Sequence, residues 1–526
     1  MTAILALGIA GNVMEPQWEP QQYDVPAEFT AVPELDGTAD EGATALVVRD
    51  NVAVTVEGET LEGLVYSPAP AGASADRNDT SGSAARPAPA GASADRDDTG
   101  GSGTGSTDSA TYPAVLFLHG AGTKDKSGFA KQAEYLARSG IVALVLDRRT
   151  KEYSTWHRDY ELMAGDALAG VELLRDRPEV DPDRVGLFGE SEGSWVAPVA
   201  AASDPRIAFM VLISAPIVPP AQQATYATLL ALESLDAPDP VKRAVAKGIG
   251  LVMTVPNLLE YANFDVVPYL EQTDQPILMA FGTEDTAVPI VQAADIVAQA
   301  NENLTVRYFE GAQHAIRIGD EFGPFADGYL NLLATWIHDT ADGAVAGPAI
   351  AGGDPVQTLS ASAVPPPPWF ATTTAHIVAL LLAVVGYAAG PVLARFGKRR
   401  RGEDAVVAPA LRRRLRWLRV AGAASLAALV LYFWGLSHLA LNHGTSRTIT
   451  YGLWVVVWII TGAAVTALSN LWLDNSWRVG KLATEVGQDY PVAKLNRVET
   501  IALSGAVAGT LVLLMLVTYW GVFLGI

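Results

Sequence analysis

The sequence predicts an α/β fold with a mainly parallel sheet, followed by an all-α region of four membrane-spanning helices. Six short apolar runs between residues 112 and 310 indicate strands, and helical stretches separate them. Strands that are apolar throughout are typical of parallel sheets covered on both faces, and their alternation with helices predicts βαβ units. The runs are "AVLFLHG", "IVALVLD", "RVGLFGE", "IAFMVLIS", "PILMAFG" and "LTVRYFE".

Composition limits the function classes. The chain has 526 residues, a formal net charge of -21 and no cysteine. A length of this size predicts more than one domain. The acidic balance argues against a nucleic-acid partner, which requires a basic face. Without cysteine there are no disulfides, no zinc–thiolate sites and no cysteine nucleophile.

The N-terminal segment, residues 1–43, contains the apolar run Ala3–Val13. This run is too short to span a bilayer. It is a candidate partial signal sequence, although the positive region that precedes most signal peptides is missing. An ordinary buried segment is the alternative.

The α/β domain is predicted to cover residues 44–340. Its first part, residues 44–66, alternates as antiparallel strands do. Residues 67–110 hold a near-perfect tandem repeat, "PAPAGASADRNDTSGS" followed by "PAPAGASADRDDTGGS". A segment so rich in Pro, Gly, Ala, Ser and Asp cannot bury a core, which predicts a disordered surface insertion without chemistry of its own.

The βα units begin near Tyr112, with helices predicted at Lys126–Ser139 and Asp159–Asp176. Residues 217–270 are longer than a crossover requires and carry helical patterns, so we expect a small cap over the carboxyl edge of the sheet. A linker rich in Pro, Gly and Ala is predicted at 341–374, and its four consecutive prolines favour an extended chain.

Four apolar segments make up residues 375–526. They lie at about 375–394, 418–440, 449–470 and 499–523. Each is close to the ~20 residues that span the hydrocarbon core of a bilayer, and tryptophans and tyrosines occur near several ends. Buried helices of a soluble bundle are the alternative interpretation. The lipid bilayer is therefore an expected partner.

The basic residues predict the orientation. "RFGKRRR" and "LRRRLRWLR" lie in the first loop, and the third loop is also basic, whereas the second has only Arg447. The positive-inside rule puts the first and third loops in the cytoplasm. We therefore expect a multi-pass protein of the cell membrane whose N-terminal domain is extracytoplasmic. Few charges lie within the segments, which favours anchoring over transport.

Ser191 is the candidate nucleophile. It lies in "GESEGSW", a Gly-x-Ser-x-Gly pattern between a predicted strand and a predicted helix. The pattern alone is weak, but in this context it is typical of the nucleophile elbow, where the serine hydroxyl stands at a helix N-terminus.

A serine nucleophile requires a base and an acid that orients the base. In this fold the chain order is Ser, then Asp or Glu, then His. Asp285 follows the strand "PILMAFG", and His314 follows the strand "LTVRYFE". Glu284 is the competing acid. His338, in an amphipathic helix, is interpreted as structural, and His157 is a weaker candidate for lining the site.

The oxyanion hole requires two backbone N–H donors. One is expected at Glu192, directly after the nucleophile. The second is expected at Ala121, because "HGAG" after the first parallel strand resembles the oxyanion loop that begins His-Gly. His119 is then a structural residue of the turn.

The motifs as a set resemble bacterial α/β-hydrolases, and most closely the serine esterase and dienelactone-hydrolase-like family. They are "YPAVLFLHGAG", "VLDRR", "GLFGESEGSWVAP", "DPRIAFMVLISAP", "FGTEDTAVP" and "FEGAQHAI". The resemblance covers about residues 45–340. It implies a serine carboxylesterase or related acyl hydrolase that needs no metal or other cofactor. Ser194 departs from the pattern, since a third glycine is common there, and true dienelactone hydrolases use a cysteine that this chain lacks.

The predicted function is a membrane-anchored serine hydrolase that acts on a small-molecule ester through the triad of Ser191, Asp285 and His314. Two alternatives remain open: a peptidase of the prolyl-oligopeptidase type, and a membrane protein whose hydrolase-like domain only binds or senses a ligand. Protein partners are not predicted, and the acyl and alcohol groups are left undefined.

Overall fold

The computed structural model describes residues 21–29, 45–69, 111–121, 125–237, 239–253, 258–320, 322–344, 349–401, 409–441, 446, 448–486 and 497–520. The chain forms two compact units. The α/β domain comprises Val25–Ile217 and Asp265–Gln357, and the helical unit comprises Met1–Asp24, Val218–Phe264 and Thr358–Ile526. The predicted signal run, and the repeat insertion beyond Ala69, lie outside the described residues.

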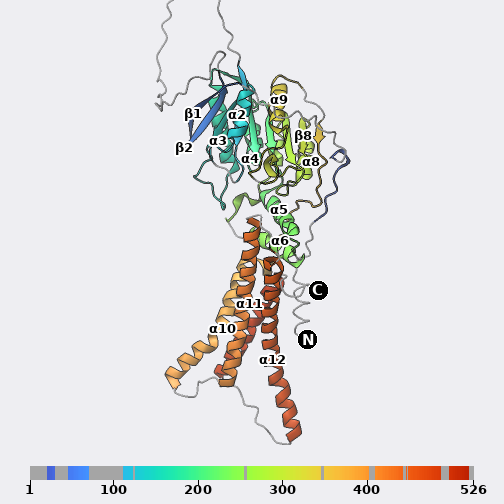
Figure 1. Cartoon of the computed structure of the whole chain (residues 1–526). Helices are drawn as coiled ribbons and strands as arrows, with labels where there is room; N and C mark the ends of the chain where they lie inside the picture. The colour runs from blue at the N-terminus through green and yellow to red at the C-terminus, as the bar shows by residue number, and fades with distance from the viewer. Residues whose placement is uncertain are drawn as a thin grey trace, which may run out of the picture. The chain divides into compact units, whose positions relative to one another are not determined.

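The α/β domain is built on a nine-stranded sheet of order β1-β2-β4-β3-β5-β6-β7-β8-β9. Strands β1 and β2 are antiparallel, β2 pairs antiparallel with β4, and every later pair is parallel. This confirms the predicted mainly parallel sheet (Figure 1). The strands are β1 Val47–Val56, β2 Glu59–Pro68, β3 Tyr112–Leu118, β4 Val142–Leu146, β5 Val180–Glu190, β6 Met210–Ile213, β7 Ile277–Gly282, β8 Leu304–Phe309 and β9 Ile350–Gly352.

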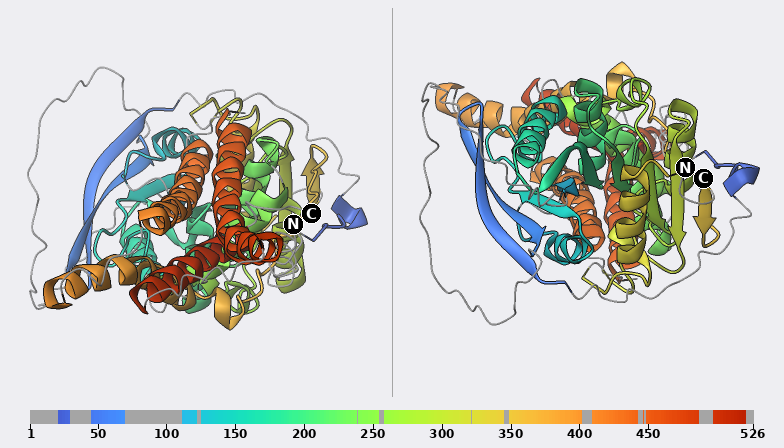
Figure 2. Two further views of the ribbon diagram at one scale, coloured as in Figure 1. Left: turned by 90° about the horizontal axis from the view of Figure 1, so that it is seen from below. Right: turned by 90° about the horizontal axis from the view of Figure 1, so that it is seen from above.

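Helices cover both faces of the sheet, as the apolar runs require. On one face, α2 (Ala130–Arg138) and α9 (Tyr329–Ala341) share a core with alternate residues of the central strands. The helices α3 (Tyr160–Arg175) and α4 (Gly193–Ser203) pack on each other and on β5. Figure 2 shows helices and strands from two further directions. Because β4, β6 and β7 are buried along their whole length, no polar alternation is visible in their sequences.

The sheet extends into the region expected to be a linker. Residues 350–352 form β9, which pairs with β8 through Tyr308 and its neighbours. The side chain of Gln357 accepts hydrogen bonds from the backbone N–H groups of Val291 and Gln292 at the start of α8 (Ile290–Ala300). A three-residue strand of small apolar residues has no sequence pattern that separates it from a linker, which is why it was not predicted.

The region expected to be a cap divides between the two units. Helices α5 (Pro220–Ser234) and α6 (Asp239–Met253) and the short helix η2 (Glu260–Asn263) belong to the helical unit. The short α7 (Val267–Leu270) belongs to the α/β domain. Leu232 and Ala237 share a core with residues of the C-terminal helices, among them Tyr432 and Val457. The predicted cap therefore packs on the helices that follow the linker.

Four long helices complete the helical unit, as predicted. Each contains an apolar stretch long enough to cross a membrane: Thr373–Leu393, Arg412–Gly435, Thr448–Leu471 and Arg497–Tyr519. The helices are α10 (Thr373–Arg401), α11 (Pro409–Leu441), α12 (Trp454–Val486), which a π-helical turn at Thr448–Leu453 precedes, and α13 (Arg497–Tyr519).

The first and last of these helices meet through glycines. A Cβ atom placed on Gly386 of α10 would lie 2.5 Å from the carbonyl oxygen of Gly505 on α13, and the reverse distance is also 2.5 Å. Gly390 and Gly509 make further close approaches, to Ala502 and Tyr387. Gly386 and Gly390, like Gly505 and Gly509, form the small-xxx-small spacing that lets helix backbones touch in a bilayer.

Candidate active site

Ser191 lies in the turn between β5 and α4. Its φ of 51° places it in the left-handed region, where a non-glycine residue is strained. The two flanking glycines are required by space. A Cβ on Gly189 would lie 2.6 Å from the carbonyl oxygen of Gly193, and a Cβ on Gly193 would lie 2.3 Å from that of Leu118. The local geometry is that of a nucleophile elbow.

Ser194, the departure from the family pattern, has a local role. Its side chain is fully buried, and its hydroxyl donates to the carbonyl oxygen of Gly189 at 3.1 Å. The hydroxyl therefore ties the first turn of α4 to the end of β5 across the elbow.

Asp285 and His314 are in direct contact. His314 Nδ1 and Asp285 Oδ2 are 2.9 Å apart, and the carboxyl group also accepts from the backbone N–H of Ala287. Asp285 is 5% exposed, whereas the competing acid Glu284 is exposed to solvent. The structure thus brings Asp285, and not Glu284, to the histidine.

The three predicted residues follow neighbouring strands at one edge of the sheet. Ser191 directly follows β5, Asp285 follows β7 and His314 follows β8. The connection after β6 lies between them, since Ile213 accepts from the N–H of Ser191 and the Ser214 hydroxyl accepts from the N–H of Ala315. Because the carboxyl ends of parallel strands share an edge, all three residues lie at the same edge of the sheet.

The predicted oxyanion loop lies beside the serine. A Cβ on Gly120 would be 3.3 Å from the Cβ of Ser191. Glu192 occupies the N-cap position of α4, so its N–H belongs to the helix N-terminus, where partial positive charge accumulates. Ala121 follows Gly120 in this loop and Glu192 follows Ser191, so both belong to the two chain segments that supply the donors of an oxyanion hole in this fold.

Arg148 links these two segments. Its Nη1 donates to the carbonyl oxygen of Gly120 at 2.9 Å and to Glu192 Oε2 at 3.1 Å, and its Nη2 donates to the carbonyl oxygen of Ala121 at 3.3 Å. The Glu192 side chain is only 1% exposed. It also accepts from Arg158 and Tyr153, and burial beside this carboxylate raises the pKa of Tyr153.

Sequence reasoning missed this cluster. The motif "VLDRR" contains Arg148, but nothing in the sequence shows that its guanidinium reaches a glutamate after the nucleophile. The available signal was Glu192 itself, an acid directly after the candidate nucleophile at the start of a helix. Where such a carboxylate is buried, it requires cationic partners.

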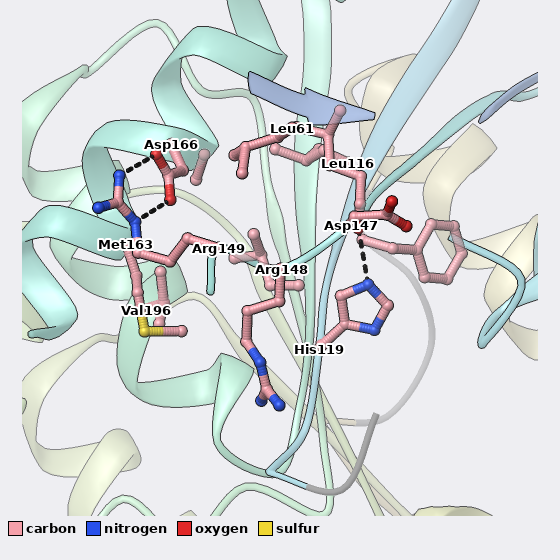
Figure 3. Close-up of a pocket in the computed structure, with 13 residues that line it drawn as sticks. Leu61, Leu116, His119, Asp147, Arg148, Arg149, Met163, Asp166 and Val196 are labelled. Carbon is pink, nitrogen blue, oxygen red and sulfur yellow. Dashed lines mark hydrogen bonds and ion pairs between the residues drawn. The ribbon is translucent and has the colours of Figure 1, made fainter. Parts of the chain in front are cut away.

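A small cavity of about 40 Å³ borders the loop. It can hold water but not a substrate group. Figure 3 shows Arg148 and Arg149 pointing to different sides of it, with Arg149 on Asp166. The pair is bidentate, at 2.6 and 2.7 Å, which anchors the loop after β4 to α3.

His119 is structural, as the sequence analysis expected. Its Nε2–H donates to the carbonyl oxygen of Leu146 at 2.7 Å, and its ring stacks on Phe129. Burial lowers the pKa of His119 from 6.5 to about 4.

The low pKa of His119 predicts a loss of stability in acid. The unfolded chain binds a proton at this histidine more tightly than the folded chain does, so the free energy of unfolding falls as the pH drops from about 6.5 towards about 4. The contribution is about 3 kcal/mol at most. We expect His119→Gln to weaken the pH dependence of the melting temperature between about pH 7 and about pH 4.5. The exposed His157→Gln serves as control, and equal slopes in the two variants would contradict the assignment.

Two other histidines lie away from the triad. His338 Nε2 bonds to the carbonyl oxygen of Ser139 at 2.7 Å, which supports its structural interpretation. His157 is exposed. Within the described residues, no group of three His, Cys, Asp or Glu side chains is placed to hold a metal ion.

One further carboxyl group, that of Glu190, directly precedes the candidate nucleophile in the chain. Burial raises its pKa, while His314 and Arg317 act in the opposite direction. At a given pH this carboxyl therefore carries less negative charge than a solvated glutamate does.

Comparison with known proteins matches part of the chain to one family model. Residues 127–323 match the model of the prolyl oligopeptidase family. The α/β domain has the α/β-hydrolase fold. The matched residues include Ser191, Asp285 and His314, and they end before the helices α10–α13.

Relatives of the hydrolase are distant. An uncharacterized protein of Mycobacterium tuberculosis is 26% identical over 209 residues, which cover 40% of this chain and 65% of that protein. The putative hydrolase YtaP of Bacillus subtilis is 26% identical over 233 residues, which cover 39% and 70%. The solved 2,6-dihydroxy-pseudo-oxynicotine hydrolase is 18% identical, with a TM-score of 0.37 over 58% of this chain and 72% of that one. The chain thus spans less than two thirds of the length of the mycobacterial relative.

Proposed function

We propose that the protein is a membrane-anchored serine hydrolase that cleaves carboxylic esters through an acyl-enzyme. The observation that carries the proposal is the Asp285–His314 hydrogen bond at the sheet edge that also holds the strained Ser191. A nucleophile on an elbow, a histidine and a buried acid are the three parts that two-step acyl transfer requires.

In the proposed mechanism His314 accepts the Ser191 proton as the serine oxygen attacks the ester carbonyl carbon. Asp285 orients the imidazole through Nδ1 and stabilises the imidazolium. The N–H groups of Ala121 and Glu192 bind the oxyanion. His314 then protonates the leaving alcohol, and afterwards it activates the water that hydrolyses the acyl-enzyme.

Arg148 is proposed to position this oxyanion hole, since it bonds to both segments that supply the donors. We expect Arg148→Met to lower kcat by about 10- to 100-fold with KM little changed, because a small displacement of the donors weakens transition-state binding. Arg158→Met is the matched control. It removes a Glu192 partner, whereas the hydrogen bonds from Arg148 to the carbonyl oxygens of Gly120 and Ala121 stay in place. An equal fall in kcat in this variant would contradict a specific role for Arg148.

A peptidase is the second candidate, and the match to the prolyl oligopeptidase family favours it. The same triad serves both reactions, so the substrate decides. We expect p-nitrophenyl esters to be hydrolysed with a kcat/KM at least about 100-fold above that of the matching p-nitroanilides of proline dipeptides. The reverse ratio, measured on the full-length protein, would establish the peptidase and reject the esterase.

The location is proposed to be the cell membrane, with the hydrolase on the extracytoplasmic side. The helices α10–α13 are long and apolar enough to cross a membrane. The basic segment Arg395–Arg401 follows the first span, and Arg412–Arg419 lies at the start of the second. Both segments are on the same side of the membrane, and the positive-inside rule assigns that side to the cytoplasm. Protease added to intact cells should cut the hydrolase. Full protection, with cleavage only after lysis, would reverse the orientation.

A further inference from the structure

The helical unit contains an apolar cavity of about 510 Å³ that the mechanism does not use. Helices α5 and α6 and the short helix η2 form most of its wall, and the ends of α11 and α13 complete it. The wall residues used below are Ala224 of α5, Val252 of α6, Phe433 of α11 and Trp520, which follows α13.

The wall has almost no groups that form hydrogen bonds. Among the residues that line the cavity, the side chains of Tyr261 and Trp520 alone carry a polar atom. A polar ligand would lose its hydrogen bonds to water there without replacement, which costs several kilocalories per mole of each group. The occupant that fits is a hydrocarbon, and the volume lies within the ~300–1,000 Å³ of ordinary ligand pockets.

The cavity lies at one end of the predicted membrane spans. Phe433 is close to the end of Arg412–Gly435, and Trp520 directly follows Arg497–Tyr519. Each of these two spans begins at an arginine, and the cavity lies at the other end of the span. The cavity and the basic loops are therefore at opposite ends of the spans. Tryptophan at such a position is typical of the membrane–water interface. The hydrocarbon chains of lipids therefore have access to the part of the cavity wall that Phe433 and Trp520 form.

We propose that this cavity binds the hydrocarbon chain of a single-chain lipid, such as a fatty acid. The proposal rests on the apolar lining of the cavity and on its place at the end of the apolar spans. The chain enters from the bilayer side, and the occupant is not a structural phospholipid.

Binding is tested on the full-length Ser191→Ala variant in lipid nanodiscs. The probe is palmitic acid with a diazirine at the end of its chain, and labelled peptides are mapped by mass spectrometry. We expect labels between residues 220 and 262, and competition by unlabelled methyl palmitate. Ala224 is an exposed residue of the cavity wall, and Ala224→Trp, which places an indole ring there, should reduce this labelling at least about tenfold. Glu233→Trp, at an exposed position of the same helix that does not line the cavity, should not.

Three results would overturn the proposal. The first is labelling confined to residues of α10–α13 other than Phe433, which is part of the cavity wall. The second is equal labelling in the two tryptophan variants. The third is a phospholipid with the same diazirine chain that labels residues 220–262 while palmitic acid does not, because the occupant would then be a bilayer lipid.

Discussion

Ser191→Ala should abolish ester hydrolysis, with a fall in kcat of about 10⁴-fold or more. The hydroxyl is the proposed nucleophile, and an alanine at this position leaves only the binding and oxyanion contributions to the rate. The measurement is p-nitrophenyl ester hydrolysis by the purified full-length protein. A fluorophosphonate probe, which reacts with activated serines, should label wild type at Ser191 and leave the variant unlabelled.

The matched control is Ser194→Ala. The Ser194 hydroxyl is buried on the carbonyl oxygen of Gly189, so its loss should lower the melting temperature while the probe still labels Ser191. If Ser191→Ala kept its activity, the nucleophile would lie elsewhere. If wild-type Ser191 did not react with the probe and no ester were cleaved, the domain that only binds a ligand would become the better interpretation.

Asp285→Asn should lower kcat by about 10⁴-fold with KM nearly unchanged. The amide keeps the shape of the carboxylate, but it can donate to His314 Nδ1 and so favours the tautomer that cannot accept the Ser191 proton. It also removes the negative charge that stabilises the imidazolium. Steady-state kinetics on a short-chain ester, with the melting temperature measured in parallel, separates this effect from unfolding.

Glu284→Gln is the control for Asp285→Asn. Glu284 is the neighbouring acid and is exposed, so its amide should leave kcat within about twofold of wild type, as surface substitutions usually do. A large loss in Glu284→Gln with little loss in Asp285→Asn would exchange the two roles and require His314 to turn away from its present partner.

Much of the fold could be predicted because burial has a simple signature in parallel strands. The runs around Val115, Leu144, Leu187 and Leu278 are apolar on both faces, since helices cover both, and the structure confirms them as strands. The order of Ser191, Asp285 and His314 was visible because each residue follows such a strand. The apolar helices were visible because a bilayer requires long apolar segments.

Contacts between distant segments could not be predicted. The approach of Arg148 to Glu192 depends on the loop after β4 reaching the start of α4, and no local pattern records it. The three-residue β9 is too short to show a period. The sequence of α5 and α6 does not say whether the sheet or the C-terminal helices cover their apolar residues. The structure places Leu232 of α5, and Ala237 between the two helices, in one core with residues of the C-terminal helices.

The contact between Gly386 and Gly505 has a consequence for the order in which the protein is made. Of the four long helices, α10 is synthesised first and α13 last, and the backbones of these two helices touch. The glycine face of α10 therefore lacks its contact with Gly505 until α13 has been made. During that interval the face is open to other small-residue helices, so the synthesis of α13 decides whether α10 is correctly paired.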